Sequence, residues 1–234
     1  MNADQSLKLK AYFEKHSSDI SAIVPFDKQS DKLFLFDFTA SNTELNPAIL
    51  ENTELFSIWI RRKLSENDSL YGVGGYNEHR TIYSRSNLFS EDGEPRRLHL
   101  GVDIWGRAGT PVFSPLNGRI HSFGFNDNFG DYGATLILEH QADEIKFHSL
   151  YGHLSLMSIE HLVKGLAVKK GQKIAEFGDV LENGHWPPHL HFQLIFNMQE
   201  LAGDYPGVCR YSERKAFLAN CPNPDLILKH TFGY

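Results

Sequence analysis

Residues 98–125 read LHLGVDIWGRAGTPVFSPLNGRIHSFGF, and the fold class follows from this stretch. It contains three short apolar-rich segments, 98–104, 111–113 and 118–125, separated by turns built on glycine, proline and asparagine. Short segments between such turns predict β-strands. Parallel strands need crossover connections of about a dozen residues or more. These connections are shorter, so we expect an antiparallel sheet.

The same pattern continues toward the C-terminus. Four more segments are strand-like, at 134–139, 145–151, 173–177 and 190–196. One helix is expected to interrupt them, around residues 158–164. The predicted fold class is therefore mainly β, and α+β overall, with an antiparallel sheet as its core.

The first ninety residues carry helical patterns instead. Leu7, Tyr12 and Phe13 predict a short amphipathic helix, and residues 33–36 (LFLF) predict a buried strand. A second helix is expected to begin at Asn46, a plausible N-cap followed by proline, and to end near residue 67. The apolar residues that recur at helical spacing in it are Ile49, Leu50, Leu55, Ile58, Trp59 and Leu64. We expect an N-terminal helical extension over 1–95, a main domain over 96–200 and a C-terminal extension over 201–234.

Composition excludes several classes of protein. The chain has 234 residues, of which 41% are apolar and 22% charged, as is usual for a globular protein. Its 23 basic and 29 acidic residues give a net charge of −6, which disfavours binding to nucleic acid. No apolar run approaches the roughly 20 residues of a membrane span. The start of the chain lacks the layout of a secretory signal, so we expect a cytoplasmic protein, with export by another route left open.

The cysteine content agrees with the expectation of a cytoplasmic protein. The chain has two cysteines, Cys209 and Cys221, and neither belongs to a Cys-x-x-Cys pair. Two cysteines in a chain of this size are not a disulfide framework, so free thiols are expected.

Twelve histidines are the feature that points to chemistry. Three short patterns contain five of the candidate residues, namely HLGVD at 99–103, YGHLS at 151–155 and HLHF at 189–192. Each spacing alone could arise by chance. However, residues i and i+2 of a strand point to one face, so His189 and His191 should lie side by side. Two adjacent imidazoles favour a shared site.

A catalytic zinc site uses three protein ligands, with water in the fourth position. His99, Asp103 and one histidine of the HLHF pair would supply two nitrogens and one carboxylate. This ligand set requires a bend near Gly101 that brings the side chains of His99 and Asp103 to one metal ion. No H-E-x-x-H helix is present, so a glutamate general base of that kind is not indicated.

The ordered set HLGVD, YGHLS and HLHF resembles the lysostaphin/LytM-type zinc metallopeptidases, over residues 98–196. The resemblance implies the antiparallel sheet of those enzymes and Zn²⁺ as cofactor. It assigns His99, Asp103 and His191 as the metal ligands, and His153 and His189 as the two catalytic histidines. The implied activity is hydrolysis of a peptide bond by metal-activated water, and the family's default substrate is a peptidoglycan-type peptide.

The chain departs from the family in several ways. Residues 93–98 lack the tyrosine that the family often has upstream of its first ligand histidine, and Tyr76 or Tyr83 is a candidate substitute. Gln193 occupies the position after HLHF where the family commonly has glutamate. We interpret this as variation in a residue that neighbours the ligands. Secreted members of the family usually carry an export signal. None is seen in this sequence, which weakens the expectation of a cell-wall substrate.

A closer resemblance bears on the substrate. Residues 75–89, 131–140, 182–194 and 204–208 are similar to peptidase-like modules of large fusion proteins, between a phosphotransferase module and a class III aminotransferase module. That likeness implies a small amide or amino-acid conjugate as the alternative substrate. A non-hydrolytic binding or regulatory module is the third interpretation, although the presence of all five site residues argues against it.

The other histidines are expected to have surface or core roles, including His121, His140, His148, His161 and His185. His185 lies in the segment that leads into HLHF, together with Asn183 and Trp186. Asn183 and Trp186 could line a substrate groove, but packing within their own loop is the favoured interpretation.

Overall fold

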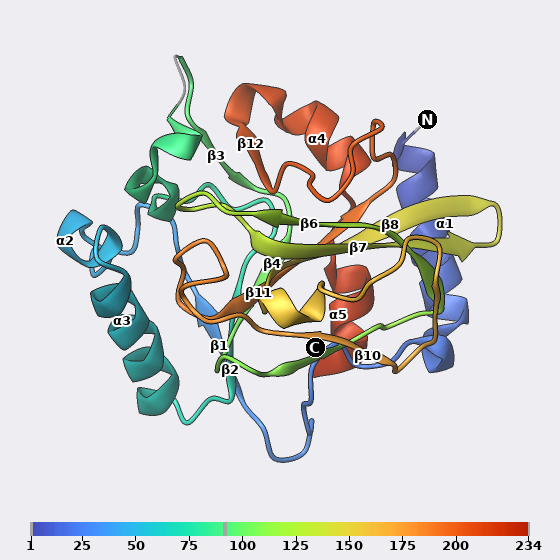
Figure 1. The fold of residues 1–234 in the computed structure, drawn as a ribbon, viewed down its shortest axis with the longest axis horizontal. Coiled ribbons are helices and arrows are strands. Elements are labelled where there is room, and N and C mark those ends of the chain that lie inside the picture. Colours follow the sequence, from blue (N-terminus) through green and yellow to red (C-terminus); the bar gives the residue numbers. More distant parts are fainter. Residues whose placement is uncertain (1, 91–92, 234) are drawn as a thin grey trace.

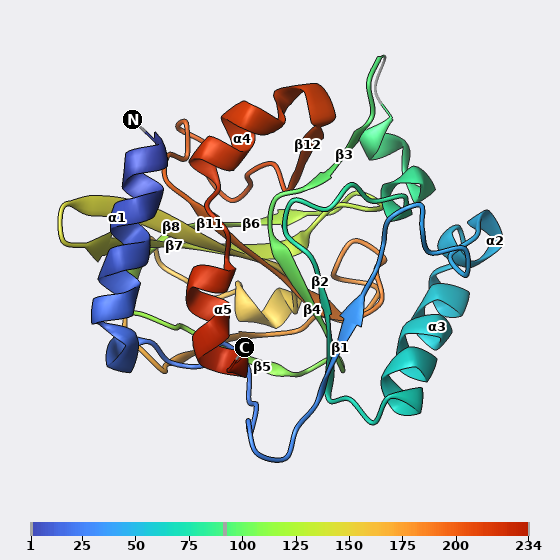
Figure 2. The ribbon, with the colours of Figure 1, turned by 180° about the vertical axis from the view of Figure 1, so that it is seen from behind.

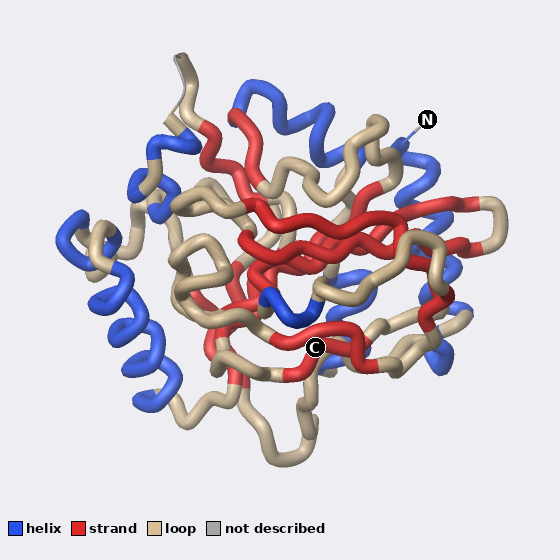
Figure 3. Tube along the Cα trace, in the orientation of Figure 1, coloured by secondary structure: helices blue, strands red, loops and turns tan. Residues whose placement is uncertain are grey.

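The structure is a computed structural model and describes residues 2–90 and 93–233. Its centre is a large β-sheet, as Figure 3 shows. The strands are β1 (Leu33–Phe36), β2 (Tyr71–Gly74), β3 (Arg96–His99), β4 (Val102–Trp105), β5 (Pro111–Phe113), β6 (Gly118–Asn126), β7 (Gly133–Ala142), β8 (Ile145–Leu154), β9 (Ala167–Val168), β10 (Lys173–Glu176), β11 (His189–Ile195) and β12 (Val208–Arg210).

The large sheet has eight strands in the order β1-β2-β4-β11-β8-β7-β6-β9 (Figure 1). Only β1 and β2 pair in parallel, and all other neighbours are antiparallel. Two small sheets pair β10 with β5 and β12 with β3. The predicted mainly β fold with an antiparallel core is confirmed.

Helices lie at the periphery of this sheet. They are α1 (Asn2–Lys15), α2 (Pro47–Leu50), α3 (Thr53–Glu66), α4 (Arg214–Asn220) and α5 (Asp225–Phe232). Figure 2 shows α1 and α5 side by side over one face, with α3 away from them near β1. The two ends of the chain therefore cover the same face of the sheet.

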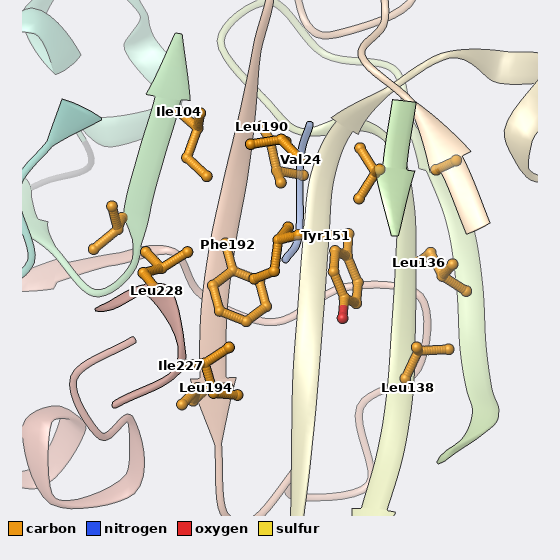
Figure 4. Packing of buried hydrophobic residues seen from close by; sticks show 14 of the residues in the cluster. Val24, Ile104, Leu136, Leu138, Tyr151, Leu190, Phe192, Leu194, Ile227 and Leu228 are labelled. Atoms are coloured by element: carbon orange, nitrogen blue, oxygen red, sulfur yellow. The ribbon is translucent and has the colours of Figure 1, made fainter. Parts of the chain in front are cut away.

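The main hydrophobic core lies between this face and the helices. Leu190, Phe192 and Leu194 of β11 are fully buried there and pack in one cluster with Ile227 and Leu228 of α5 (Figure 4). Side chains alternate between the faces of a strand. The odd-numbered histidines of β11 therefore lie on the opposite face, away from this core.

The predicted helix over 46–67 is two helices. Asn46 caps α2 by accepting a hydrogen bond from Ile49 N, with Pro47 in its first turn, as expected. The helix then stops, because Asn52 accepts hydrogen bonds from the backbone of residues 54 and 55 and so begins α3. Leu55 and Ile58 are exposed, against expectation. The buried face of α3 consists of Phe56, Ser57, Trp59 and Ile60.

The predicted helix over 158–164 is wrong. Residues 156–158 form one short 3-10 turn, and residues 159–164 form turns and coil. Val163 is exposed, whereas Ile159 and Leu162 pack against the main core from these turns without forming a helix. Ser158 Oγ instead accepts a hydrogen bond from the backbone of Glu176, which ties the turn to β10.

The predicted strand over 98–104 bends as the ligand set requires. It divides into β3 and β4, and residues 100 and 101 lie between them. A Cβ atom on Gly101 would lie 2.6 Å from the His191 ring, so only glycine fits at this bend without moving that imidazole.

All three predicted parts of the chain contribute to one core. Phe13 of α1, Leu190 of β11 and Leu228 of α5 belong to the same cluster, and β1 and β2 extend the main sheet. The proposed boundaries at 95 and 200 stay a prediction. Cys209 and Cys221 are both buried free thiols. None of the described helices is both long enough and apolar enough to cross a membrane.

Candidate metal centre

The sheet order brings the three sequence motifs together. Strand β11 lies between β4 and β8, so the HLHF motif is flanked by the HLGVD and YGHLS motifs (Figure 1). His191 is directly opposite Asp103 on one side and Gly152 on the other. The bend at Gly101 adds His99, from the end of β3. Residues separated by up to 92 positions therefore meet at one place.

Three potential ligand atoms converge here. His191 Nδ1 is 2.9 Å from His99 Nε2 and 3.0 Å from Asp103 Oδ1. His99 Nε2 is 3.3 Å from Asp103 Oδ1. All three residues are buried, and they form the one His/Cys/Asp/Glu cluster of the described residues with ligand atoms gathered closely enough for a metal ion.

The outer hydrogen bonds fix which nitrogens carry protons. His99 Nδ1 donates to the carbonyl oxygen of Gly75 at 2.9 Å, and His191 Nε2 donates to Gln193 Oε1 at 2.9 Å. The inner nitrogens then present lone pairs, and Asp103 presents a carboxylate oxygen. Three electron-rich atoms at this spacing repel one another unless a cation lies among them. The donor set of two imidazoles and one carboxylate fits zinc.

Burial and charge keep two of the three candidate ligands, His99 and Asp103, in the protonation states that metal binding requires. Burial, together with the Arg80 cation, lowers the pKa of His99 to about 4, so its ring is neutral at pH 7. Burial opposes ionisation of Asp103, but the adjacent Arg80 guanidinium favours the carboxylate, and the pKa of Asp103 lies well below its usual range. A neutral imidazole and a carboxylate are the forms that bind metal.

Arg80 orients Asp103, a role that no sequence motif predicted. The fully buried guanidinium forms a short ion pair with Asp103 Oδ2 and donates from Nε to Glu78 Oε2 at 2.6 Å. Asp103 Oδ1 is thereby left facing the two histidines. Burial disfavours the Arg80 cation, but Asp103 outweighs this effect and raises its pKa.

His153 and His189 form a second pair beside the ligands. Their ring centroids are 4.1 Å apart. His153 Nδ1 donates to Asn183 O and His189 Nδ1 to Pro187 O, each at 2.8 Å. Each Nε2 atom therefore carries a lone pair that can accept a proton. Burial lowers the pKa of His189 to about 4 and that of His153 well below its usual value.

The backbone at His153 is irregular. Leu154 pairs with Ala134 and Tyr151 with Leu136, so two residues of β8 lie opposite one residue of β7. His153 also has a φ of 61°, which costs a residue with a side chain about 1–3 kcal/mol. Such a bulge redirects a side chain. It turns His153 toward His189, although regular alternation would point it to the core with Tyr151.

A cavity of about 250 Å³ opens onto this site, and Asp103, His153, His189 and His191 line it. Aromatic rings form much of its wall. Trp105 stacks on His189 with ring centroids 3.8 Å apart, and Trp186 lies 6.3 Å from His189. The other lining residues are Ile82, Tyr83, Leu88, Phe89, Arg96, Gly130, Asp131, Tyr132, Asp204, Tyr205, Pro206, Gly207 and Val208.

The structure separates the tyrosine candidates. Tyr83 lines the cavity and its hydroxyl accepts a bond from Arg80 at 3.4 Å, whereas Tyr76 donates to Cys221 O and lies outside the cavity lining. Tyr132 was missed by sequence reasoning, because its segment reads as a simple turn. Its hydroxyl is 3.4 Å from His191 Nε2, and its ring is 5.5 Å from that of His153.

The loop before HLHF combines the two roles considered for it, packing within the loop and lining of the cavity. Asn183 is fully buried and holds the loop, since its amide bonds to Gly178 O and Trp186 O. Trp186 lines the cavity. His185 stacks on Phe129 and is not among the residues that line the cavity.

Comparisons with known proteins agree on one family. The sequence profile of Peptidase family M23 matches residues 97–202. Over 171 residues the chain is 30% identical to the DD-carboxypeptidase/endopeptidase Mpg of Neisseria meningitidis, which covers 68% of this chain and 36% of Mpg. Over 94 residues it is 35% identical to Lipoprotein NlpD of Yersinia enterocolitica, which covers 40% of this chain and 86% of NlpD.

Among solved structures, the catalytic domain of the antimicrobial peptidase lysostaphin from Staphylococcus simulans aligns with 69% of this chain and 96% of that domain. The identity is 23% and the TM-score 0.41. The chain spans only 36% of the length of Mpg. The profile match contains all five predicted site residues, whereas Arg80 and Tyr83 lie outside it.

Proposed function

Since the chain belongs to peptidase family M23, we propose that it is a zinc-dependent peptidase that hydrolyses a peptide bond with water, a peptidoglycan-type peptide being its substrate class. One observation carries the zinc dependence. His99 Nε2, Asp103 Oδ1 and His191 Nδ1 lie within 3.3 Å of one another with their lone pairs inward. Such a cluster is stable when a cation neutralises it.

The remaining residues supply what zinc does not. Bound zinc would act as a Lewis acid on the scissile carbonyl and lower the pKa of water toward about 7. His153 and His189 would then move protons, since each Nε2 atom is free to accept one and to give it up. One ring would take the proton from the attacking water and then deliver it to the leaving amine, and the other would hydrogen-bond the oxyanion once its Nε2 carries a proton. The carbonyl groups of Asn183 and Pro187 hold both rings in the required tautomer.

Substrate size is the finer question. Mpg is named for carboxypeptidase and endopeptidase activities, which favours a peptide with D-amino acids. The cavity walls include Leu88, Phe89 and Val208, which lie outside the M23 match. These additional walls of the cavity support the alternative of a small amide or amino-acid conjugate as substrate.

The experiment is a hydrolysis panel with metal control. The purified protein is expected to hold about one zinc per chain, to lose activity on chelation and to regain it with zinc. Peptidoglycan peptides and small acylated amino acids are assayed in parallel by mass spectrometry, which separates the two substrate classes. A chain that binds no zinc, or that is equally active after complete chelation, would contradict the proposal. Zinc binding without hydrolysis of any substrate would favour a binding module.

A further inference from the structure

Arg85 is a buried cation without a counter-ion among the described residues. Its side chain is 8% exposed, and only Nη2 makes hydrogen bonds, to Thr53 Oγ1 at 2.7 Å and to His185 O at 3.2 Å. Nε and Nη1 are buried and have no partner, which leaves three N–H groups unused. Arg80, the other deeply buried arginine of the site region, bonds to two carboxylates instead.

The environment does not compensate this charge. The rings of Trp186, Phe129 and Phe56 lie 4.6, 5.0 and 5.7 Å from Arg85 Cζ. Cation–π contacts offset part of the cost of burying an ion, but they supply no counter-ion. Burial accordingly lowers the pKa of Arg85 to about 10, so it still carries its charge at pH 7. An anion is the group that this position lacks.

Arg85 is next to the cavity of the metal centre. Trp186 contacts Arg85 and also lies 6.3 Å from the rings of both His153 and His189. A second hollow of about 410 Å³ is lined by Arg85, Ser86, Asn87, Leu88, Asn128 and Phe129. Leu88 lines both spaces, so the two adjoin along the same chain segment.

We propose that Arg85 binds a carboxylate of the substrate, so that the enzyme acts on amides that carry a free carboxylate near the scissile bond. This inference rests on the proposed hydrolase function and names the substrate class of the same site. The ring of Phe129 packs over the guanidinium and is 43% exposed, and the proposal requires this ring to rotate so that the carboxylate can enter. Asp131 lines the adjoining cavity, and its charge repels a phosphate dianion more strongly than a singly charged carboxylate.

The guanidinium is prepared for this role. Its Nη2 atom is held by Thr53 and by the His185 carbonyl, and Thr53 Oγ1 itself donates to that carbonyl at 3.0 Å. The segments that carry Arg85 and Phe129 are also tied together, since Ser86 Oγ donates to Phe129 O at 2.6 Å. A cation fixed in advance loses little entropy when its ligand binds.

The test compares N-acetylated peptides of two to four D-alanine residues, each as the free acid and as the C-terminal amide. Binding to metal-depleted protein is measured by calorimetry, and hydrolysis by the zinc-loaded protein is measured separately. For at least one length, the free acid should bind about 10- to 100-fold more tightly than the amide, the range expected for charged hydrogen bonds. Arg85→Met should remove this preference, and Arg85→Lys should reduce it. Inorganic phosphate should not displace the peptide better than chloride does.

The exposed Arg61 on α3 provides the matched control, and Arg61→Met should keep the full preference. Thermal unfolding of each variant shows whether it folds, and Arg85→Lys carries the comparison if Arg85→Met does not. Equal binding of acid and amide at every length, or an unchanged preference in the folded Arg85 variants, would overturn the inference. Tight phosphate binding without carboxylate binding would overturn it too. Hydrolysis without an acid preference rejects this inference alone, whereas an acid preference without hydrolysis rejects the proposed function alone.

Discussion

His191 lies directly opposite Asp103 across the pair β11 and β4, and its Nδ1 atom is 3.0 Å from Asp103 Oδ1. Neither atom has a proton to donate to the other once Gln193 holds the ring of His191 in its Nε2–H tautomer. The contact is therefore favourable only with a cation between these groups and His99.

Replacing either member of this pair should abolish zinc binding. A ligand that binds only the folded state at 100 times its Kd raises the unfolding free energy by about 2.7 kcal/mol. Zinc should therefore raise the Tm of the wild type, and should leave that of His191→Ala and Asp103→Asn unchanged. Calorimetric melts with and without zinc check this. The exposed His161 supplies the control, since His161→Ala should respond like the wild type. A full zinc-induced rise in His191→Ala would show that the ligands are elsewhere.

His153 and His189 should be needed for turnover but not for the metal. We expect His153→Asn and His189→Asn each to lower kcat about 10²- to 10⁴-fold, the usual range for an acid or base, with one zinc per chain retained. Asparagine is chosen because it tolerates the positive φ of residue 153. Steady-state kinetics and metal analysis are measured on the same samples, with His161→Asn as control. Loss of zinc in these variants would instead make the two histidines structural partners of the ligands.

Arg80 should act through Asp103. Arg80→Lys keeps the positive charge but cannot donate to Glu78 and Asp103 from two arms of one planar group. Loss of such an outer partner weakens metal binding about 10- to 100-fold in other sites, and a similar rise in the zinc Kd is expected. Chelator competition measures it, with Arg61→Lys as the surface control. An unchanged Kd, in a variant that melts like the wild type, would show that Asp103 needs no such partner.

His140 should make the fold sensitive to acid. It is buried between Asn117 O and Ser149 Oγ, and burial lowers its pKa to about 4 from 6.5. Between these values the unfolded chain binds a proton that the folded chain does not, so stability present above pH 6.5 is lost as the pH falls toward 4. His140→Gln should flatten this loss by up to about 1.4 kcal/mol per pH unit.

Urea unfolding of chelator-treated protein from pH 4.5 to 7 measures that slope. Chelation keeps metal release out of the comparison. His161→Gln changes an exposed histidine and should leave the slope as in the wild type. If His140→Gln and the wild type lose stability in parallel, His140 does not carry the effect.

The alternation of short apolar segments and glycine turns was enough to predict the antiparallel sheet, because both are local properties of the chain. The sequence also predicted that His189 and His191 lie on one face of a strand. It predicted a bend near Gly101 as well, because the ligand set requires one. Local pattern failed where packing decides. Residues 158–164 look helical, but Ile159 and Leu162 reach the core from turns and coil. Asn52 divides the second predicted helix by accepting hydrogen bonds from its own backbone neighbours.

The sequence by itself therefore determined the sheet, since strand periodicity is a local property. The five candidate site residues came from the resemblance of the three ordered motifs to the lysostaphin/LytM-type peptidases. Only the tertiary structure decided that His153 faces the site. Regular alternation along β8 would place His153 in the core with Tyr151. A bulge, in which two residues of β8 lie opposite one residue of β7, turns the His153 side chain to the other face. The partners of Arg80 and Arg85 could not be predicted from the sequence either. Whether a buried arginine finds a carboxylate depends on distant segments, which no local pattern encodes.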